Sequence, residues 1–201
     1  LNIPKDRFLL TSIFGGSIEE FVTVAKIMAP VSDGLELNLS CPHAKGYGMA
    51  MGQDPDLVRQ ITAAVKAVVD IPVIPKLTPN TPDIAKIAKA AIAGGADGLC
   101  AINTAGPGYT SSHGYPVLSN GAGGMSGKGV LPIGLQCVRD IAAVTDCPII
   151  GCGGVSSAAD VRAYFDAGAA VVGVGSSLTG LTTDEVSAYF KALSNDLDTD
   201  N

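Results

Sequence analysis

The chain has 201 residues, 47% hydrophobic and 16% charged, which fits one globular domain with a sizeable core. A net charge of −6, with no cluster of Lys and Arg, argues against a nucleic-acid-binding surface, which needs a basic face to meet phosphates. No apolar run approaches the roughly 20 residues of a membrane-spanning helix, and the first residues lack a signal-peptide pattern. We therefore expect a cytoplasmic protein with a small-molecule partner.

Short apolar runs alternate with stretches of helical period along the whole chain. The predicted strands are Phe8–Phe14, Gly34–Leu39, Val73–Leu77, Gly98–Asn103, Pro148–Gly151 and Ala170–Val174. The predicted helices are Ile18–Met28, Asp56–Val69, Asp83–Ala93, Leu131–Val144, Ala158–Ala167 and Asp184–Leu193. This repeated strand–helix order indicates a parallel sheet with right-handed crossovers.

The boundaries of these elements carry the residues that such a fold requires. Pro55 and Pro82 are placed in the first turns of their helices, where the missing N–H costs nothing. Nothing resembles a linker, so residues 1–201 are treated as a single domain. The stretch Ala105–Gly127 is predicted to be a long irregular loop, which is usually functional, and Ala44–Gly52 is a second loop that could act as a lid.

Six strand–helix units are two short of the eight that close a TIM (β/α)8 barrel. The chain is either an open doubly wound sheet or a barrel whose first two units are missing. We favour the partial α/β barrel, because the chain enters its first strand abruptly and without an initiating Met.

Most polar and glycine signals follow the carboxyl ends of the predicted strands, the face that carries the active site in such barrels. The turns at Gly153–Gly154 and Gly175–Ser176 are typical of a phosphate cradle, although each alone could simply permit a tight turn. Lys76 ends an apolar strand and needs an anionic partner or an electron-rich ring, unless its ammonium reaches water.

The five cysteines, with no CxxC pair, indicate neither a disulfide framework nor a metal site. Cys41 follows a strand on the catalytic face and is a candidate general base, and Asn38 could orient an amide-like substrate. The other four cysteines are read as small core residues. His43 is a base, a substrate donor or only a polar loop residue.

Several motifs, in order and spacing, resemble class 1 dihydroorotate dehydrogenases between about Phe8 and Gly180. They are Glu36–His43, Gly52–Pro55, Pro75–Pro79, Ile102–Thr104, Leu118–Asn120, Gly123–Gly127 and Ile150–Gly154. The resemblance implies an FMN-dependent oxidation of dihydroorotate to orotate in pyrimidine biosynthesis. Cys41 would take the C5 proton while hydride passes from C6 to the flavin.

The same resemblance implies roles for other positions. The substrate-binding residues would be Asn38, His43, Asn103 and Thr104. The FMN-binding residues would be Ser12, Asn38, Lys76, Ile102, Gly127, Gly153, Gly154, Gly175 and Ser176. The use of a cysteine as the base makes the chain similar to the soluble class 1 enzymes. The Gly124–Gly127 pattern looks closest to the form that pairs with an iron–sulfur flavoprotein subunit and uses NAD, as a homodimer or heterotetramer.

Two departures from the family pattern leave alternatives open. Cys-Pro-His at residues 41–43 replaces the usual Cys-Pro-Asn and is similar to dihydropyrimidine dehydrogenase, which reduces uracil and thymine. Without the first two units, three expected cofactor- and substrate-binding groups are missing. We therefore expect this chain alone to be inactive, and a non-catalytic barrel remnant that binds FMN or phosphate is the third reading.

Overall fold

The computed structural model describes residues 3–4, 6–40 and 51–198. Its central sheet has six parallel strands in the order β1-β2-β3-β4-β9-β10. The strands are β1 Leu10–Ile13, β2 Gly34–Asn38, β3 Val73–Leu77, β4 Leu99–Ala101, β9 Ile149–Cys152 and β10 Val171–Gly173. The predicted strands and their parallel arrangement are confirmed.

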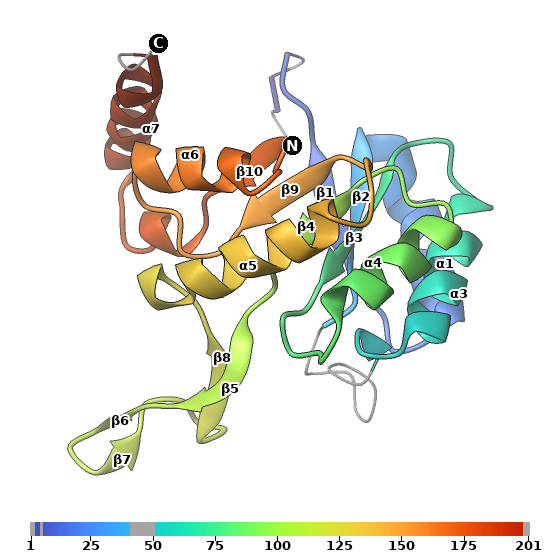
Figure 1. Ribbon diagram of the computed structural model, residues 1–201, viewed down its shortest axis with the longest axis horizontal. Coiled ribbons are helices and arrows are strands. Elements are labelled where there is room, and N and C mark those ends of the chain that lie inside the picture. Colours follow the sequence, from blue (N-terminus) through green and yellow to red (C-terminus); the bar gives the residue numbers. More distant parts are fainter. Residues whose placement is uncertain (1–2, 5, 41–50, 199–201) are drawn as a thin grey trace.

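Helices follow the strands and cover one face of the curled sheet (Figure 1). They are α1 Ile18–Met28, α3 Pro55–Lys66, α4 Ile84–Ala93, α5 Leu131–Ala142, α6 Ala158–Asp166 and α7 Thr183–Asp198. Short 3-10 turns lie at η1 Ala29–Val31, η2 Lys128–Val130 and η3 Ser176–Leu178. All six predicted helices are present.

Local capping explains where several helices begin. The side chain of Ser17 accepts a hydrogen bond from Glu20 N at the start of α1, and Asp54 caps α3 directly before Pro55. The prediction that Pro82 lies in the first turn of its helix was wrong. Asp83 is the N-cap of α4, so Pro82 lies just outside the helix, where it restricts the entering chain.

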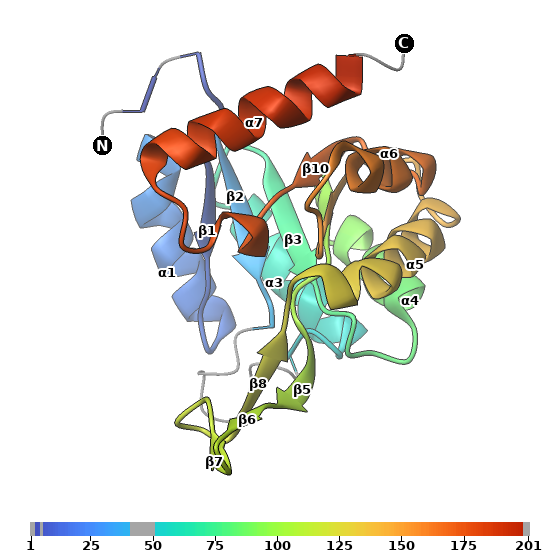
Figure 2. The same cartoon turned by 90° about the vertical axis from the view of Figure 1, so that its left-hand side faces the viewer.

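The core lies between the sheet and the helices that pack on its outer face. Leu35, Leu37 and Leu99 from the strands are fully buried against Phe21 and Ile141 from the helices. The two outer strands, β1 and β10, each pair on one side only within the described residues. The sheet is therefore an incomplete barrel with two open edges, and α7 crosses the molecule at the end opposite the ribbon described next (Figure 2).

The predicted irregular loop between β4 and α5 is the clearest difference between expectation and structure. Residues 105–125 form an antiparallel ribbon of β5 Ala105–Tyr109 and β8 Ala122–Met125, extended by β6 Ser111–Ser112 and β7 Tyr115–Pro116. Both faces of this ribbon are largely exposed, so its sequence has no apolar alternation to indicate strands. It projects from the carboxyl ends of the sheet strands (Figure 1).

None of the helices in the described part of the chain is long and apolar enough to cross a membrane.

Candidate functional site

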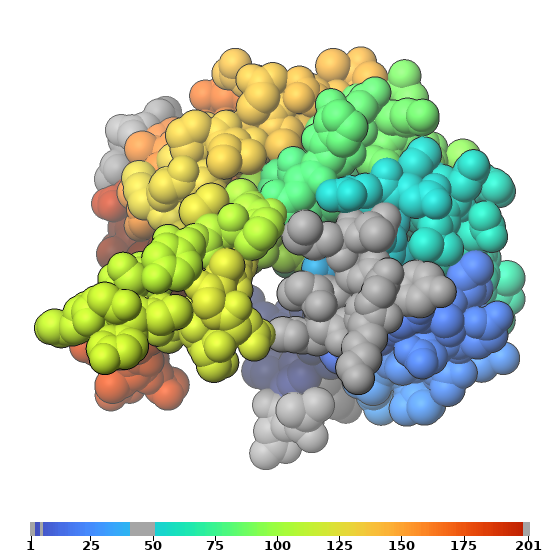
Figure 3. All heavy atoms as spheres, turned by 90° about the horizontal axis from the view of Figure 1, so that it is seen from below, coloured from blue at the N-terminus to red at the C-terminus, as the bar shows by residue number. Residues whose placement is uncertain are grey.

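A cavity of about 430 Å³ opens at the carboxyl ends of the sheet strands. Strand β3 contributes Lys76, the segment after β4 contributes Ile102 to Thr104, and the turns after β9 and β10 contribute glycines. Figure 3 shows the molecule from this end, with a hollow beside the yellow-green ribbon. The sheet topology thus brings together residues up to 166 positions apart, from Leu10 to Ser176.

The glycine turns bring their backbone to the wall of this cavity. Among the described residues, no hydrogen bond from the amides of Gly153, Gly154, Gly175 or Ser176 to another residue is formed. Gly153 and Gly154 have φ values of 120° and 76°, which side-chain-bearing residues rarely adopt. A Cβ on Gly175 would meet no atom within 4 Å, so its backbone borders open space. These donors fit a phosphate group.

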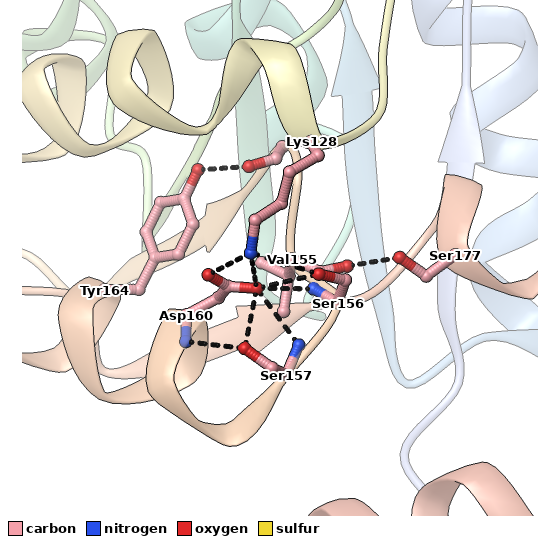
Figure 4. Close-up of polar contacts among 8 residues, drawn as sticks. Lys128, Val155, Ser156, Ser157, Asp160, Tyr164 and Ser177 are labelled. Atoms are coloured by element: carbon pink, nitrogen blue, oxygen red, sulfur yellow. Dashed lines mark hydrogen bonds and ion pairs between the residues drawn. The ribbon is translucent and has the colours of Figure 1, made fainter.

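Two side-chain hydroxyls hold the two glycine turns in place by hydrogen bonds to carbonyls of the turn after β9 (Figure 4). The Tyr164 hydroxyl donates to the Gly153 carbonyl at 2.8 Å, and the Ser177 hydroxyl donates to the Val155 carbonyl at 2.6 Å. The second bond connects the turn after β10 to the turn after β9. Tyr164 is fully buried, because Gly134 and Gly151 leave space for its ring. The cradle is therefore supported by α6 and by a hydrogen bond between its two turns.

The N-terminus of α6 is occupied by its own carboxylate and is not free to bind an anion. Asp160 accepts hydrogen bonds from Ser156 N and Ser157 N at 3.0 Å each, and Lys128 Nζ lies 2.7 Å from both of its oxygens. Burial opposes ionisation, but the bonds from Lys128 and both serines outweigh it and hold the pKa of Asp160 well below its ordinary value. A phosphate must therefore use the glycine turns.

Lys76 belongs to a chain of polar contacts across three neighbouring strands. Its Nζ lies 3.5 Å from Glu36 Oε1, which also accepts a 2.8 Å hydrogen bond from Ser12 Oγ. Burial alone lowers the pKa of Lys76, but Cys100, Cys152 and Glu36 nearby outweigh that effect and raise it. The site therefore holds a stable cation beside the cavity.

Asparagine side chains connect the ends of β2, β3 and β4. Asn103 Nδ2 donates to Asn38 Oδ1 at 2.9 Å, and Thr104 N donates to Asn103 Oδ1 at 2.8 Å. Asn80 adds bonds to the Thr104 carbonyl at 3.2 Å and from Gly106 N at 2.9 Å. A second cavity of about 460 Å³ lies between these residues and the ribbon.

Most of the predicted site residues lie together. Nine line the first cavity: Lys76, Ile102, Asn103, Thr104, Gly127, Gly153, Gly154, Gly175 and Ser176. Asn38 reaches them through Asn103. Ser12 does not line the cavity and contacts it only through Glu36. Cys41 and His43 lie outside the described residues.

The structure adds residues that the sequence analysis did not single out. Glu36 is a buried carboxylate with 8% of its surface exposed, and its position within an apolar strand was the available signal. Ser40 Oγ is buried without a hydrogen-bond partner among the described residues and lines the second cavity. Tyr164 and Asn80 act through contacts between distant segments, which no local pattern indicates.

Comparison with known proteins accounts for this arrangement. A family model described as "Dihydroorotate dehydrogenase" matches residues 4–194. The chain belongs to the dihydroorotate dehydrogenase family. It is 52% identical over 172 residues to a Methanosarcina acetivorans protein named dihydroorotate dehydrogenase B (NAD(+)), catalytic subunit, covering 85% of this chain and 55% of the relative. A Pyrococcus horikoshii protein of the same name is 50% identical over 171 residues, covering 85% and 56%.

A solved dihydroorotate dehydrogenase structure shows the same fold. The enzyme from Eimeria tenella, determined in complex with ferulenol, superposes with a TM-score of 0.73 at 22% sequence identity. The match covers 90% of this chain and 53% of that one. The chain thus spans a little over half the length of the curated relatives it matches, and the family fold is a barrel of which this sheet is a part.

Proposed function

We propose that the protein carrying this chain oxidises dihydroorotate to orotate with bound FMN, in de novo pyrimidine (UMP) biosynthesis. One observation carries the proposal: unsatisfied glycine-turn amides, the Lys76 cation and the Asn38–Asn103 pair share one end of the parallel sheet. Family membership supports the reaction, since the relatives are named for it.

The residues present fit FMN. Its phosphate would accept hydrogen bonds from the amides of Gly153, Gly154, Gly175 and Ser176, with Gly127 and Ile102 along the cavity wall. Lys76 would place its charge beside the N1/C2 region of the ring and stabilise the reduced anion. When bound, FMN supplies a two-electron acceptor for hydride. Riboflavin lacks the phosphate, so we expect it to bind at least 100-fold more weakly than FMN; equal affinity would contradict the phosphate cradle.

The chain's own residues would hold the pyrimidine and move its proton. Asn38, Asn103 and Thr104 would bind the ring and its carboxylate, with His43 as a further contact. Cys41 would take the C5 proton as the C6 hydride leaves on the flavin side. Replacing Cys41 by Ala in the full-length protein should leave FMN bound and slow flavin reduction by dihydroorotate by orders of magnitude. Reduction at the parent rate would exclude Cys41 as the base.

The remaining parts of the assembly are also proposals. The relatives are named catalytic subunits of an NAD(+) enzyme, which supports an electron-transfer partner of the iron–sulfur flavoprotein kind, in a homodimer or heterotetramer. Two further strand–helix units would pair with the open edges of β1 and β10 and complete a single barrel domain. Until those edges are covered, we expect this chain to be inactive. We also propose a cytoplasmic location for the protein.

A further inference from the structure

The side chain of Asn80 connects the end of β3 to the base of the ribbon. Its Nδ2 donates to the Thr104 carbonyl at 3.2 Å, and its Oδ1 accepts from Gly106 N at 2.9 Å. These two backbone groups flank Ala105, the first residue of β5. The Asn80 amide therefore pairs with this edge of the chain as a peptide group of a neighbouring parallel strand would.

This side-chain bridge lies where the pairing of the ribbon itself is irregular. The register between β5 and β8 shifts between Ala105 and Gly108, and Pro107 within that interval has no N–H to donate. At this irregularity, Gly106 N donates to the side chain of Asn80. Asn80 thus holds the ribbon to the sheet at a point where the two ribbon strands hold each other weakly.

The backbone of Asn80 is itself fixed in position. Asn80 N donates to Thr78 Oγ1 at 3.1 Å, and Thr78 is fully buried at the end of β3. The Asn80 carbonyl accepts a hydrogen bond from Gln53 Nε2, directly before the N-cap of α3. Because β3 and α3 fix the backbone of Asn80, its amide can set the position of the Thr104 carbonyl.

Thr104 relates this bridge to the site. Thr104 lines both cavities, whereas Asn80 lines only the second. The Thr104 side chain packs so closely on Gly124 of β8 that a Cβ there would overlap it. We propose that Asn80 is a positioning residue, whose amide holds Thr104 and the base of the ribbon in place for the substrate without contacting FMN. The inference rests on the proposed function, which assigns Thr104 to the substrate.

The first test compares Asn80→Ala and Asn80→Asp in the full-length protein with bound FMN. Asn80→Asp keeps the size of the side chain and the acceptor for Gly106 N, but sets a second acceptor against the Thr104 carbonyl. In both variants the KM for dihydroorotate should rise about tenfold or more, while the limiting rate of flavin reduction changes less than about threefold. The FMN content should stay at the parent level.

This split between KM and limiting rate separates positioning from a general loss of structure, which would lower FMN content and rate together. Asn80→Asp decides the outcome if Asn80→Ala does not fold. An unchanged KM, or loss of bound FMN in both variants, would overturn the proposal. Gln53→Ala is the matched control, because it removes only the bond to the Asn80 carbonyl, and its KM should equal that of the parent.

A second measurement needs no substrate. Hydrogen–deuterium exchange, read by mass spectrometry, should be about tenfold faster or more at residues 104–109 in Asn80→Ala, and unchanged in Gln53→Ala and in peptides of α6. Equal exchange at residues 104–109 in Asn80→Ala and the parent would overturn the bridge. If dihydroorotate does not reduce the flavin of the parent, the proposed function fails, and the exchange still decides whether Asn80 holds the ribbon.

Discussion

Lys76 Nζ and Glu36 Oε1 lie 3.5 Å apart on adjacent strands, so a buried carboxylate holds the cation that we propose to lie beside the flavin ring. Glu36 partly neutralises the charge of Lys76, and the Ser12 hydroxyl donates a hydrogen bond to the same carboxylate. The side chains of Lys76 and Glu36 are 25% and 11% exposed. Their ion pair is therefore partly buried, and the electrostatic interaction is stronger than between fully exposed charges.

Replacing Glu36 by Gln should raise the midpoint potential of the bound flavin. Removal of the anion leaves Lys76 less compensated, and the stronger positive field favours the anionic reduced form. We expect an increase of about 30 mV or more, where about 30 mV corresponds to tenfold in the two-electron equilibrium. Spectroelectrochemistry of the holoprotein measures it. Ser12→Ala, which keeps the ion pair, should shift the potential less, and an unchanged potential in Glu36→Gln would refute this role.

Tyr164→Phe should loosen the phosphate cradle. The substitution removes the 2.8 Å hydrogen bond to the Gly153 carbonyl and leaves that acceptor unsatisfied, at a cost of about 1 kcal/mol in unfolding free energy. FMN affinity, followed by quenching of flavin fluorescence, should fall several-fold. Tyr189→Phe is the matched control, since the Tyr189 hydroxyl has no partner among the described residues. Equal affinity in both variants would show that Tyr164 does not position the turn.

Asp160→Asn should destabilise the protein in a pH-dependent way. Because the folded pKa of Asp160 is lowered, its contribution is present above the unfolded pKa of about 3.9 and is lost as pH falls toward the folded value. We expect a loss of about 2 kcal/mol at neutral pH that shrinks below about pH 4, measured by denaturant unfolding. Asp166→Asn, at the exposed end of the same helix, should show little change. A loss independent of pH would contradict the ionic role.

Gly124→Ala should affect substrate binding and leave FMN in place. A Cβ on Gly124 would overlap the Thr104 side chain, so β8 or Thr104 must move. The apparent KM for dihydroorotate should rise about tenfold or more, while the FMN content stays at the parent level. Gly129→Ala meets no atom within 4 Å and serves as the control. Loss of FMN with an unchanged KM would place Thr104 on the cofactor side.

The order of strands and helices could be predicted from the sequence, because hydrophobic period and capping residues such as Ser17 and Asp54 are local signals. The glycine turns and Lys76 could be singled out, since they lie at or just after the carboxyl ends of strands in a parallel sheet. The ribbon could not be predicted, because Gly108 and Gly123 pair through their backbone alone and leave no side-chain pattern.

The side-chain contacts between neighbouring strands also could not be predicted from the sequence. The Glu36–Lys76 pair depends on the β2–β3 register, and the contact between the Cys100 and Cys152 sulfurs depends on the β4–β9 register. Cysteines read as core residues are compatible with burial, but nothing local indicates that two of them meet in a cavity. Likewise, the space for the Tyr164 ring exists only once Gly134 and Gly151 pack against α6.

The most direct test of the proposed function is anaerobic reduction of the bound flavin in the full-length protein, followed by loss of its visible absorbance. Dihydroorotate and dihydrouracil are added separately, because Cys-Pro-His at residues 41–43 is similar to the pyrimidine reductases. The account predicts rapid bleaching by dihydroorotate and none by dihydrouracil. Bleaching by dihydrouracil alone, or bound flavin that neither substrate reduces, would contradict it.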